Sequence, residues 1–125
     1  MVKFGTLDFY KKWAEAINKD EKVSKSDLTT TILHVYTDVK DEKDAPKAFF
    51  MKIENGKVTD VREAKPDEKA EFVISTTYNM WVGIAKGEIN PQKANPKYNL
   101  VKALKYMGVL NRINEIPKEL KDIEY

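Results

Sequence analysis

The pair Asn55-Gly56 restricts the fold more than any other feature of the sequence, because it lies between two stretches that favour β-strands. Asn-Gly is typical of a two-residue type I′ turn, in which both residues adopt positive φ. Before it, apolar residues at 49, 51 and 53 alternate with Phe50 and Lys52. After it, residues 57–63 form a returning strand. Because the turn is so short, the two strands must pair in an antiparallel manner.

Two further stretches predict strands of the same sheet. Residues 28–37 are rich in Thr, Ile, Val and Tyr, which favour a pleated strand, and neither face is strongly polar. This strand should therefore be covered, at least in part, on both sides. Residues 71–75 form a fourth strand after a Pro-containing polar loop, and the charged residues 38–47 form a loop. Three consecutive strands with short links predict a meander.

Residues 7–18 form the cleanest amphipathic helix, with Thr6 as its N-cap. One half of its helical wheel is apolar and consists of Leu7, Phe9, Tyr10, Trp13, Ala14 and Ile17. A helix that covers the core is the favoured interpretation. Contact with anionic lipid is the alternative, since lysines flank the apolar face, although two acids on the polar face weaken it.

A second helix is predicted after the fourth strand. Thr77 can cap its beginning, Gly87 can end it in the left-handed conformation, and Asn90-Pro91 can start another helix. The apolar arc spans roughly 200°, about twice what one core contact needs. The arc consists of Tyr78, Met80, Trp81, Val82, Ile84, Ala85 and Ile89. The helix should therefore have apolar material on two sides: the sheet, and either another helix, which the pattern favours, or a ligand cavity.

The region after Pro96 predicts a split helix rather than a continuous one. A single helix over residues 100–116 would be apolar all round, which is unfavourable at a surface. Residues 106–114 alone predict an amphipathic helix, which should end before Pro117. Residues 98–103 have a composition that leans helical. The polar tail, residues 118–125, is a candidate for mobility.

Charge and composition argue against several classes of protein. The net charge is +2 and no concentrated basic stripe is present, which argues against nucleic-acid binding. The absence of cysteine excludes disulfides and thiolate metal sites. No apolar signal core or membrane-spanning run is present, and the last four residues do not resemble a peroxisomal Ser-Lys-Leu signal. The expected location is the cytoplasm.

The residues that usually carry catalysis are sparse. His34 is the only histidine, so neither a structural zinc site nor a His-based triad can be assembled from this chain alone. In the middle of a strand it is expected to be a hydrogen-bonded structural residue. The acids at 38, 41, 42 and 44 do not match a calcium-binding loop. No phosphate-binding glycine loop is present. We expect no enzymatic activity, no cofactor and no metal.

Two motifs in the second half of the sequence are specific enough to indicate a family. The first is Lys86-Gly87-Glu88-Ile89-Asn90-Pro91-Gln92, whose Gly-x-x-Asn-Pro turn is the most specific part, and the second is Tyr106-Met107-Gly108-Val109-Leu110. Together they resemble the sterol carrier protein family, also called non-specific lipid transfer proteins. The resemblance runs from about residue 29 to residue 113. It implies a fifth strand at residues 98–103 and a tunnel that the C-terminal helix partly closes. Relatives bind sterols, fatty acids, fatty acyl-CoA or phospholipids in this tunnel.

The expected fold is one α+β domain over residues 1–125, with a mostly antiparallel sheet of about five strands and helices packed over one face. An apolar cavity should lie between the sheet and the helices. Its candidate ligand-binding residues are Trp81, Ile84, Ala85, Met107, Leu110 and Ile113, with Phe50 and Trp13 as weaker candidates. Each of these is also a reasonable core residue.

The resulting hypothesis is non-catalytic binding, and potentially transfer, of a fatty acid, fatty acyl-CoA or sterol-like ligand. The alternative is an accessory or interaction subunit with the same fold and a filled core. Where the family usually has a Gly-Asp or Gly-Asn pair, this sequence has Lys105-Tyr106. Tyr106 could narrow the cavity, which disfavours sterols more than linear chains. Transient membrane contact is a further option, and the sequence leaves the oligomeric state open.

Overall fold

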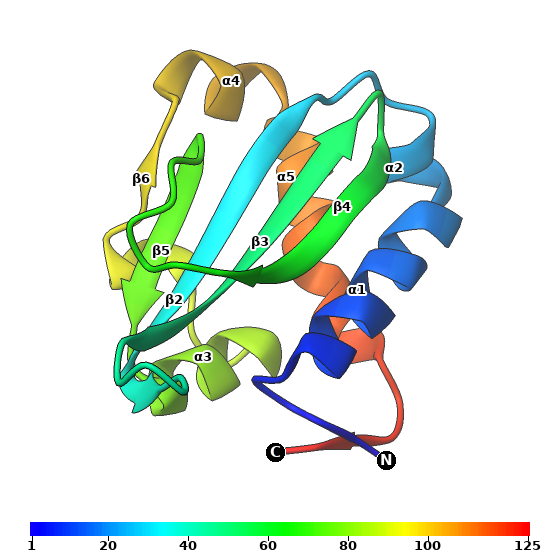
Figure 1. The fold of residues 1–125 in the computed structure, drawn as a ribbon. Coiled ribbons are helices and arrows are strands. Elements are labelled where there is room, and N and C mark those ends of the chain that lie inside the picture. Colours follow the sequence, from blue (N-terminus) through cyan, green and yellow to red (C-terminus); the bar gives the residue numbers. More distant parts are fainter.

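A five-stranded sheet lies at the centre of the computed structural model, which describes residues 1–125 (Figure 1). Its strands are β2 (Thr30–Lys40), β3 (Pro46–Glu54), β4 (Lys57–Ala64), β5 (Phe72–Thr76) and β6 (Lys97–Tyr98). Their order across the sheet is β4-β3-β2-β5-β6, and only the β2–β5 pair is parallel. The predicted meander and the mostly antiparallel sheet are therefore confirmed. The charged loop is shorter than predicted, because β2 continues to Lys40 and β3 begins at Pro46.

The hairpin between β3 and β4 has the predicted turn. Asn55 has φ 46° and Gly56 has φ 79°, and the flanking residues Glu54 and Lys57 pair directly. The turn also contacts the chain before β2, since the Gly56 amide donates a hydrogen bond of 2.9 Å to the Leu28 carbonyl oxygen. A local sequence signal thus fixes the register of two strands.

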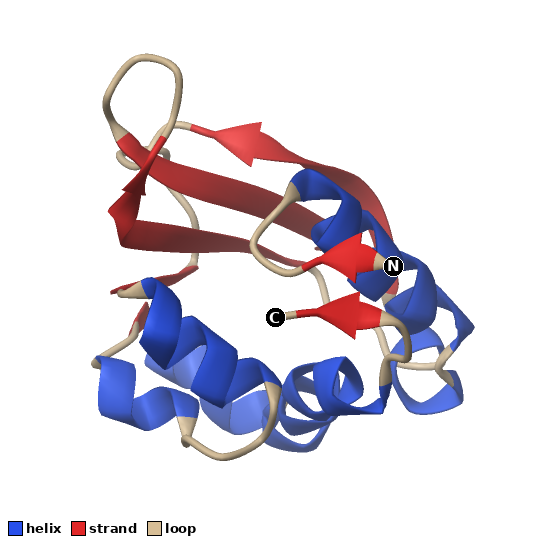
Figure 2. Ribbon diagram, turned by 90° about the horizontal axis from the view of Figure 1, so that it is seen from below, coloured by secondary structure: helices blue, strands red, loops and turns tan.

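The helices cover one face of the sheet, as Figure 2 shows with the sheet above them, and this confirms the predicted fold class. They are α1 (Leu7–Lys19), α2 (Glu21–Ser24), α3 (Tyr78–Ala85), α4 (Leu100–Lys105) and α5 (Met107–Glu115), with two 3₁₀ turns, η1 (Pro91–Ala94) and η2 (Ile116–Glu119). Apolar side chains of α1, α2, α3, α5 and η2 form one core with the strand residues Ile32, Tyr36, Phe49, Met51 and Ile53.

Helix α1 begins at its predicted cap, where the Thr6 hydroxyl oxygen accepts a hydrogen bond from the Phe9 amide. Five of the six predicted apolar residues are buried, namely Phe9, Tyr10, Trp13, Ala14 and Ile17. The sixth, Leu7, is partly buried. Because this face packs into the core, it is not available for the membrane contact that we considered as an alternative.

Helix α3 also has the predicted ends. The Thr77 hydroxyl oxygen accepts from the Met80 amide at 3.3 Å, and Gly87 after the helix has φ 77°. The Asn90 side chain then accepts from the Gln92 amide at 2.9 Å and caps η1. These local hydrogen bonds satisfy backbone groups that would otherwise have no partner.

The predicted fifth strand over residues 98–103 is wrong in its extent. Strand β6 contains only Lys97 and Tyr98, and helix α4 begins at Leu100. The Asn99 side chain caps this helix by accepting from the Lys102 amide at 3.1 Å, which explains why the helical composition prevails. The predicted split is confirmed at Tyr106, whose φ of −111° and ψ of 24° separate α4 from α5.

The C-terminal tail is paired with the other end of the sequence. Strand β7 (Ile123–Glu124) lies parallel to β1 (Val2–Lys3), so the labelled ends are close together in Figure 1. The Phe4 amide donates to the Glu124 carbonyl oxygen at 2.8 Å, and the rings of Phe4 and Tyr125 are 5.3 Å apart. The tail, which we considered a candidate for mobility, forms backbone pairing that no local pattern predicts.

The face of the sheet opposite the helices has a smaller apolar cluster of Leu33, Val35, Ala48 and Phe50. Ala64, Ala70 and Val73 pack against it, and the segment between β4 and β5 crosses this face in Figure 1. The Arg62 guanidinium lies 4.3 Å from the centre of the Phe50 ring and pairs with Glu68. Strand β2 is thus covered on both sides, as predicted.

We expect Gly56→Ala to destabilise the protein by at least ~2 kcal/mol, because the left-handed conformation alone costs about 1–2 kcal/mol for a residue with a Cβ. The added Cβ would also overlap the Val23 carbonyl oxygen and lie 2.6 Å from that of Ser26. Chemical denaturation gives the free energy of unfolding. Asn55→Gly is the matched control and should change it by less than about 0.5 kcal/mol, since glycine accepts positive φ. Equal losses in both variants would contradict this interpretation.

Candidate functional site

An apolar cavity of about 320 Å³ lies between the sheet and the C-terminal helices. The sheet contributes Ile32, His34, Phe72 and Ile74 to its wall. The facing wall comes mainly from α4 and α5 and includes Leu100, Ala103, Leu104, Met107, Leu110 and Ile113. Pockets for small molecules typically have volumes of about 300–1,000 Å³ and mostly apolar walls. This cavity meets both criteria, at the lower end of the volume range.

The cavity has a buried floor and an open mouth. At the floor, Ile113 is 1% exposed and His34 is 7% exposed. On the side of α4, Leu100 and Leu104 are 60% and 61% exposed, and Met107 is also exposed. The cavity therefore runs from the centre of the sheet to solvent beside α4.

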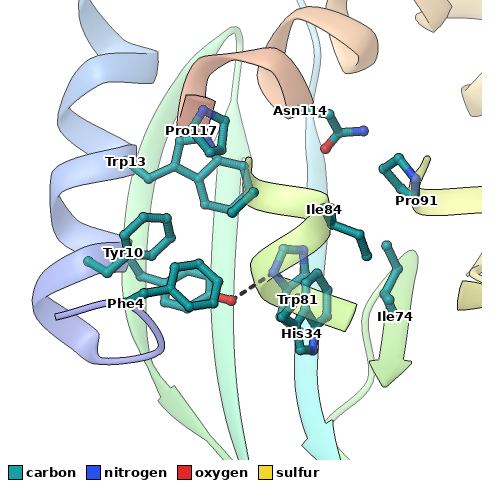
Figure 3. A pocket seen from close by; sticks show the side chains of 12 residues that line it. Phe4, Tyr10, Trp13, His34, Ile74, Trp81, Ile84, Pro91, Asn114 and Pro117 are labelled. Atoms are coloured by element: carbon teal, nitrogen blue, oxygen red, sulfur yellow. Dashed lines mark hydrogen bonds between the residues drawn. The ribbon is translucent and has the colours of Figure 1, made fainter. Parts of the chain in front are cut away.

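A second cavity of about 30 Å³ lies beside the first, and its lining residues are shown in Figure 3. It has room for about one water molecule. The two cavities share four lining residues, which are His34, Ile74, Pro91 and Asn114. His34 therefore borders both spaces.

The structure divides the predicted site residues into three groups. Met107, Leu110 and Ile113 line the large cavity. Trp13, Trp81, Ile84 and Ala85 line the small one. Phe50 lines neither, because it lies on the opposite face of the sheet under Arg62. Tyr106, which we considered as a residue that could narrow the cavity, lines neither cavity and packs against the core instead.

His34 has the expected structural role, and it is also a cavity residue that our list did not include. Its Nδ1 atom shares a hydrogen bond of 2.9 Å with the Tyr10 hydroxyl, drawn as the dashed line in Figure 3, and that hydroxyl is 2.8 Å from the Tyr36 hydroxyl. Its ring stacks on Trp81 with 4.1 Å between centres. Alternation along the strand placed His34 on the face of Ile32 and Tyr36, but it did not reveal that this face borders open space.

Burial keeps this network uncharged. It lowers the pKa of His34 to about 3, so the imidazole is neutral at physiological pH. Burial likewise raises the pKa of both Tyr10 and Tyr36, whose hydroxyls stay protonated. No Lys, Arg, Asp or Glu side chain lines either cavity. The floor thus provides hydrogen-bonding groups without charge.

The segment around the mouth carries positive charge. Between Ile89 and Asn114 the sequence has no acid and five basic residues. Two of them are paired: Lys102 Nζ is 2.8 Å from a Glu71 oxygen, and Arg112 Nε is 2.9 Å from an Asp20 oxygen. The remaining three, Lys93, Lys97 and Lys105, form no ion pair in the structure. None of the helices has the length and apolar character needed to cross a membrane.

Buried neutral His34 predicts a specific dependence of stability on pH. Below its ordinary pKa of about 6.5 the unfolded chain binds a proton that the folded chain does not, so folding becomes less favourable as pH falls. With a folded pKa of about 3, we expect a loss of about 2 kcal/mol between about pH 7 and pH 5.

Denaturant titrations at several pH values would measure this slope. His34→Gln is the control and should flatten it in that range. The carboxylates whose pKa is lowered by partners, such as Glu68 and Glu71, lose their contribution only below about pH 4.5. An unchanged slope in His34→Gln would show that other groups cause the dependence.

Comparisons with known proteins agree with the sequence resemblance. The crystal structure of sterol carrier protein 2 matches with a TM-score of 0.73 and 15% identity, over 92% of this chain and 97% of that one. A conserved hypothetical protein from Thermus thermophilus, described as possibly a sterol carrier protein, matches with a TM-score of 0.73 and 16% identity. The match covers 91% of this chain and 87% of that one. Sterol carrier protein domain 2 of Helicoverpa armigera matches with a TM-score of 0.57 and 17% identity, over 92% of this chain and 89% of that one.

At these identities the structural matches show a common fold. No curated protein matches the sequence significantly. Residues 14–101, more than half of the chain, match the SCP-2 sterol transfer family. The chain therefore belongs to the SCP-2 sterol transfer family.

Proposed function

We propose that this protein binds a lipid with a long hydrocarbon chain in the large cavity and carries it between membranes, without catalysing a reaction. The observation that carries the proposal is the open apolar cavity between sheet and helices, in a chain of this family. Each methylene removed from water contributes about 0.8 kcal/mol, so a chain can bind without specific chemistry at its tail.

The size and shape of the cavity favour a linear chain over a sterol. Its volume of about 320 Å³ is near the lower limit for small-molecule pockets. A flexible chain can fill this space and extend through the exposed mouth, whereas a rigid ring system has to fit as a whole. The acyl part of a fatty acid, fatty alcohol or fatty acyl-CoA meets this requirement.

The mouth has the chemistry of a surface that contacts an anionic membrane. Leu100, Val101, Leu104 and Met107 are exposed apolar residues on α4 and at the start of α5, and Val101 is 78% exposed. The unpaired Lys93, Lys97 and Lys105 belong to the same segment. Each lysine near an anionic bilayer contributes about 1 kcal/mol, and the apolar side chains add burial in the interface. A lipid could then pass between bilayer and cavity without crossing water.

A change that fills the cavity should abolish lipid binding. Ala103 lines the cavity from α4, so Ala103→Trp places a large side chain in the space that a ligand would occupy. We expect affinity for a fluorescent fatty-acyl probe, titrated into delipidated protein, to fall by about tenfold or more, a change of about 1.4 kcal/mol.

Val101→Trp is the matched control, because Val101 lies on the same helix but does not line the cavity. This variant should bind the probe as the native protein does. Circular dichroism checks that both variants are folded. The absence of saturable binding by folded native protein would favour the alternative of an accessory subunit.

Vesicle binding tests the membrane surface separately. Val101→Asp introduces an anion into the exposed patch without touching the cavity lining. It should weaken sedimentation with vesicles of phosphatidylcholine and phosphatidylserine by about fivefold or more, and leave probe binding unchanged. Thr59→Asp, at an exposed position on β4, introduces the same charge elsewhere and should have no effect. Equal binding to purely zwitterionic vesicles would argue against the role of the lysines.

A further inference from the structure

One buried side-chain atom beside the two cavities has no hydrogen-bond partner within the fold, the Nε2 atom of His34. Apart from the buried tyrosines and tryptophans, whose polar atoms are hydrogen-bonded, the buried polar residues are Thr30 and His34. The Thr30 hydroxyl donates to a Glu71 oxygen at 2.8 Å. His34 uses Nδ1 for Tyr10, and Nε2 has no hydrogen-bond partner in the protein. No completely enclosed side-chain nitrogen or oxygen lacks a partner, so Nε2 must border open space.

That open space is the cavity system, because His34 lines both cavities. The ring cannot easily turn away, since it stacks on Trp81 at 4.1 Å and meets the Tyr10 ring edge-on at 5.6 Å. The hydrogen bond at Nδ1 fixes the ring further. A polar atom is therefore held at the apolar floor in one orientation, and leaving such an atom without a partner is unfavourable.

We propose that His34 Nε2 binds the polar head of the ligand, and that this head is an uncharged hydroxyl, as in a straight-chain fatty alcohol. The ligand then lies with its head at the floor of the cavity and its tail toward the mouth between Leu104 and Met107. This inference rests on the proposed function and names the class of lipid and its direction within the cavity.

The absence of charge around the floor selects against an anionic head. No Lys or Arg lines either cavity, so a carboxylate at Nε2 would lose its hydration without gaining a counter-ion. A bulky charged head such as that of an acyl-CoA would have to stay outside. A hydroxyl avoids both problems because it is neutral and small.

A hydroxyl can also pair with His34 in either tautomer of its imidazole ring. If Tyr10 donates to Nδ1, then Nε2 carries the proton and donates to the ligand. If Nδ1 carries the proton, Nε2 accepts instead. Because a hydroxyl can donate and accept, it pairs with Nε2 in both tautomers.

The test compares three ligands of equal chain length near neutral pH: the alcohol, the carboxylate and the plain hydrocarbon. Competition against the fatty-acyl probe in delipidated native protein should rank the alcohol about fivefold tighter than the hydrocarbon, which corresponds to about one neutral hydrogen bond. His34→Phe keeps an aromatic ring and removes both ring nitrogens. It should lower alcohol affinity to that of the hydrocarbon, so that the fivefold preference for the alcohol disappears.

Two outcomes would overturn the assignment while the proposed function survives. One is tighter binding of the carboxylate than of the alcohol, and the other is equal weakening of alcohol and hydrocarbon in His34→Phe, as a purely structural role predicts. Failure of all three ligands to bind folded native protein would overturn the proposed function and the assignment together.

A spectroscopic readout keeps the assignment testable if His34→Phe does not fold. Since His34 is the only histidine, its imidazole nitrogens give an unambiguous NMR signal in the native protein. Saturating alcohol should shift the Nε2 resonance, whereas saturating hydrocarbon should shift it much less. Equal shifts with the two ligands would overturn the assignment.

Discussion

The hydrogen-bonded chain of Tyr36, Tyr10 and His34 is the constraint on which the rest of the structure depends. It joins α1 to β2 through distances of 2.8 and 2.9 Å, and aromatic rings surround it. Tyr10 stacks on Phe49 at 4.3 Å, and His34 stacks on Trp81 of α3. Large rigid rings fill the space under β2 and β3. The filling stops at His34, and the large cavity begins there, under β2 and β5.

The same short helix serves the cavity and the outer surface. Helix α4 has six residues; Leu100, Ala103 and Leu104 line the cavity, and Val101 faces solvent. A cavity wall that is also an exposed apolar surface would let a lipid pass directly from a bilayer into the protein. The lysines of the same segment would favour approach to anionic membranes. The proposed orientation, with the head at the floor of the cavity, is consistent with this path. Lipid heads lie at the bilayer surface that α4 would contact, so the head would enter the cavity first.

Local features could be predicted from the sequence because a few neighbouring residues determine them. The positive φ values at Asn55-Gly56 and the caps at Thr6 and Thr77 each depend on residues within one turn. The fifth strand was predicted from family resemblance against a composition that leaned helical, and the Asn99 cap shows that the local signal was the better guide. The pairing of β7 with β1 joins residues at opposite ends of the sequence, which no local pattern can indicate.

The sequence by itself determined the turns, the caps, the alternation along each strand and the scarcity of residues that usually carry catalysis. Only the tertiary structure decided which apolar residues face open space. Leu110 and, as a weaker candidate, Phe50 were both predicted to line the cavity, yet Phe50 lies under Arg62 and only Leu110 lines the cavity. A filled core and a cavity require the same kinds of side chain, so their difference lies in the distance between packed elements. Alternation gives a strand two faces, and long-range packing alone determines which one is left partly uncovered.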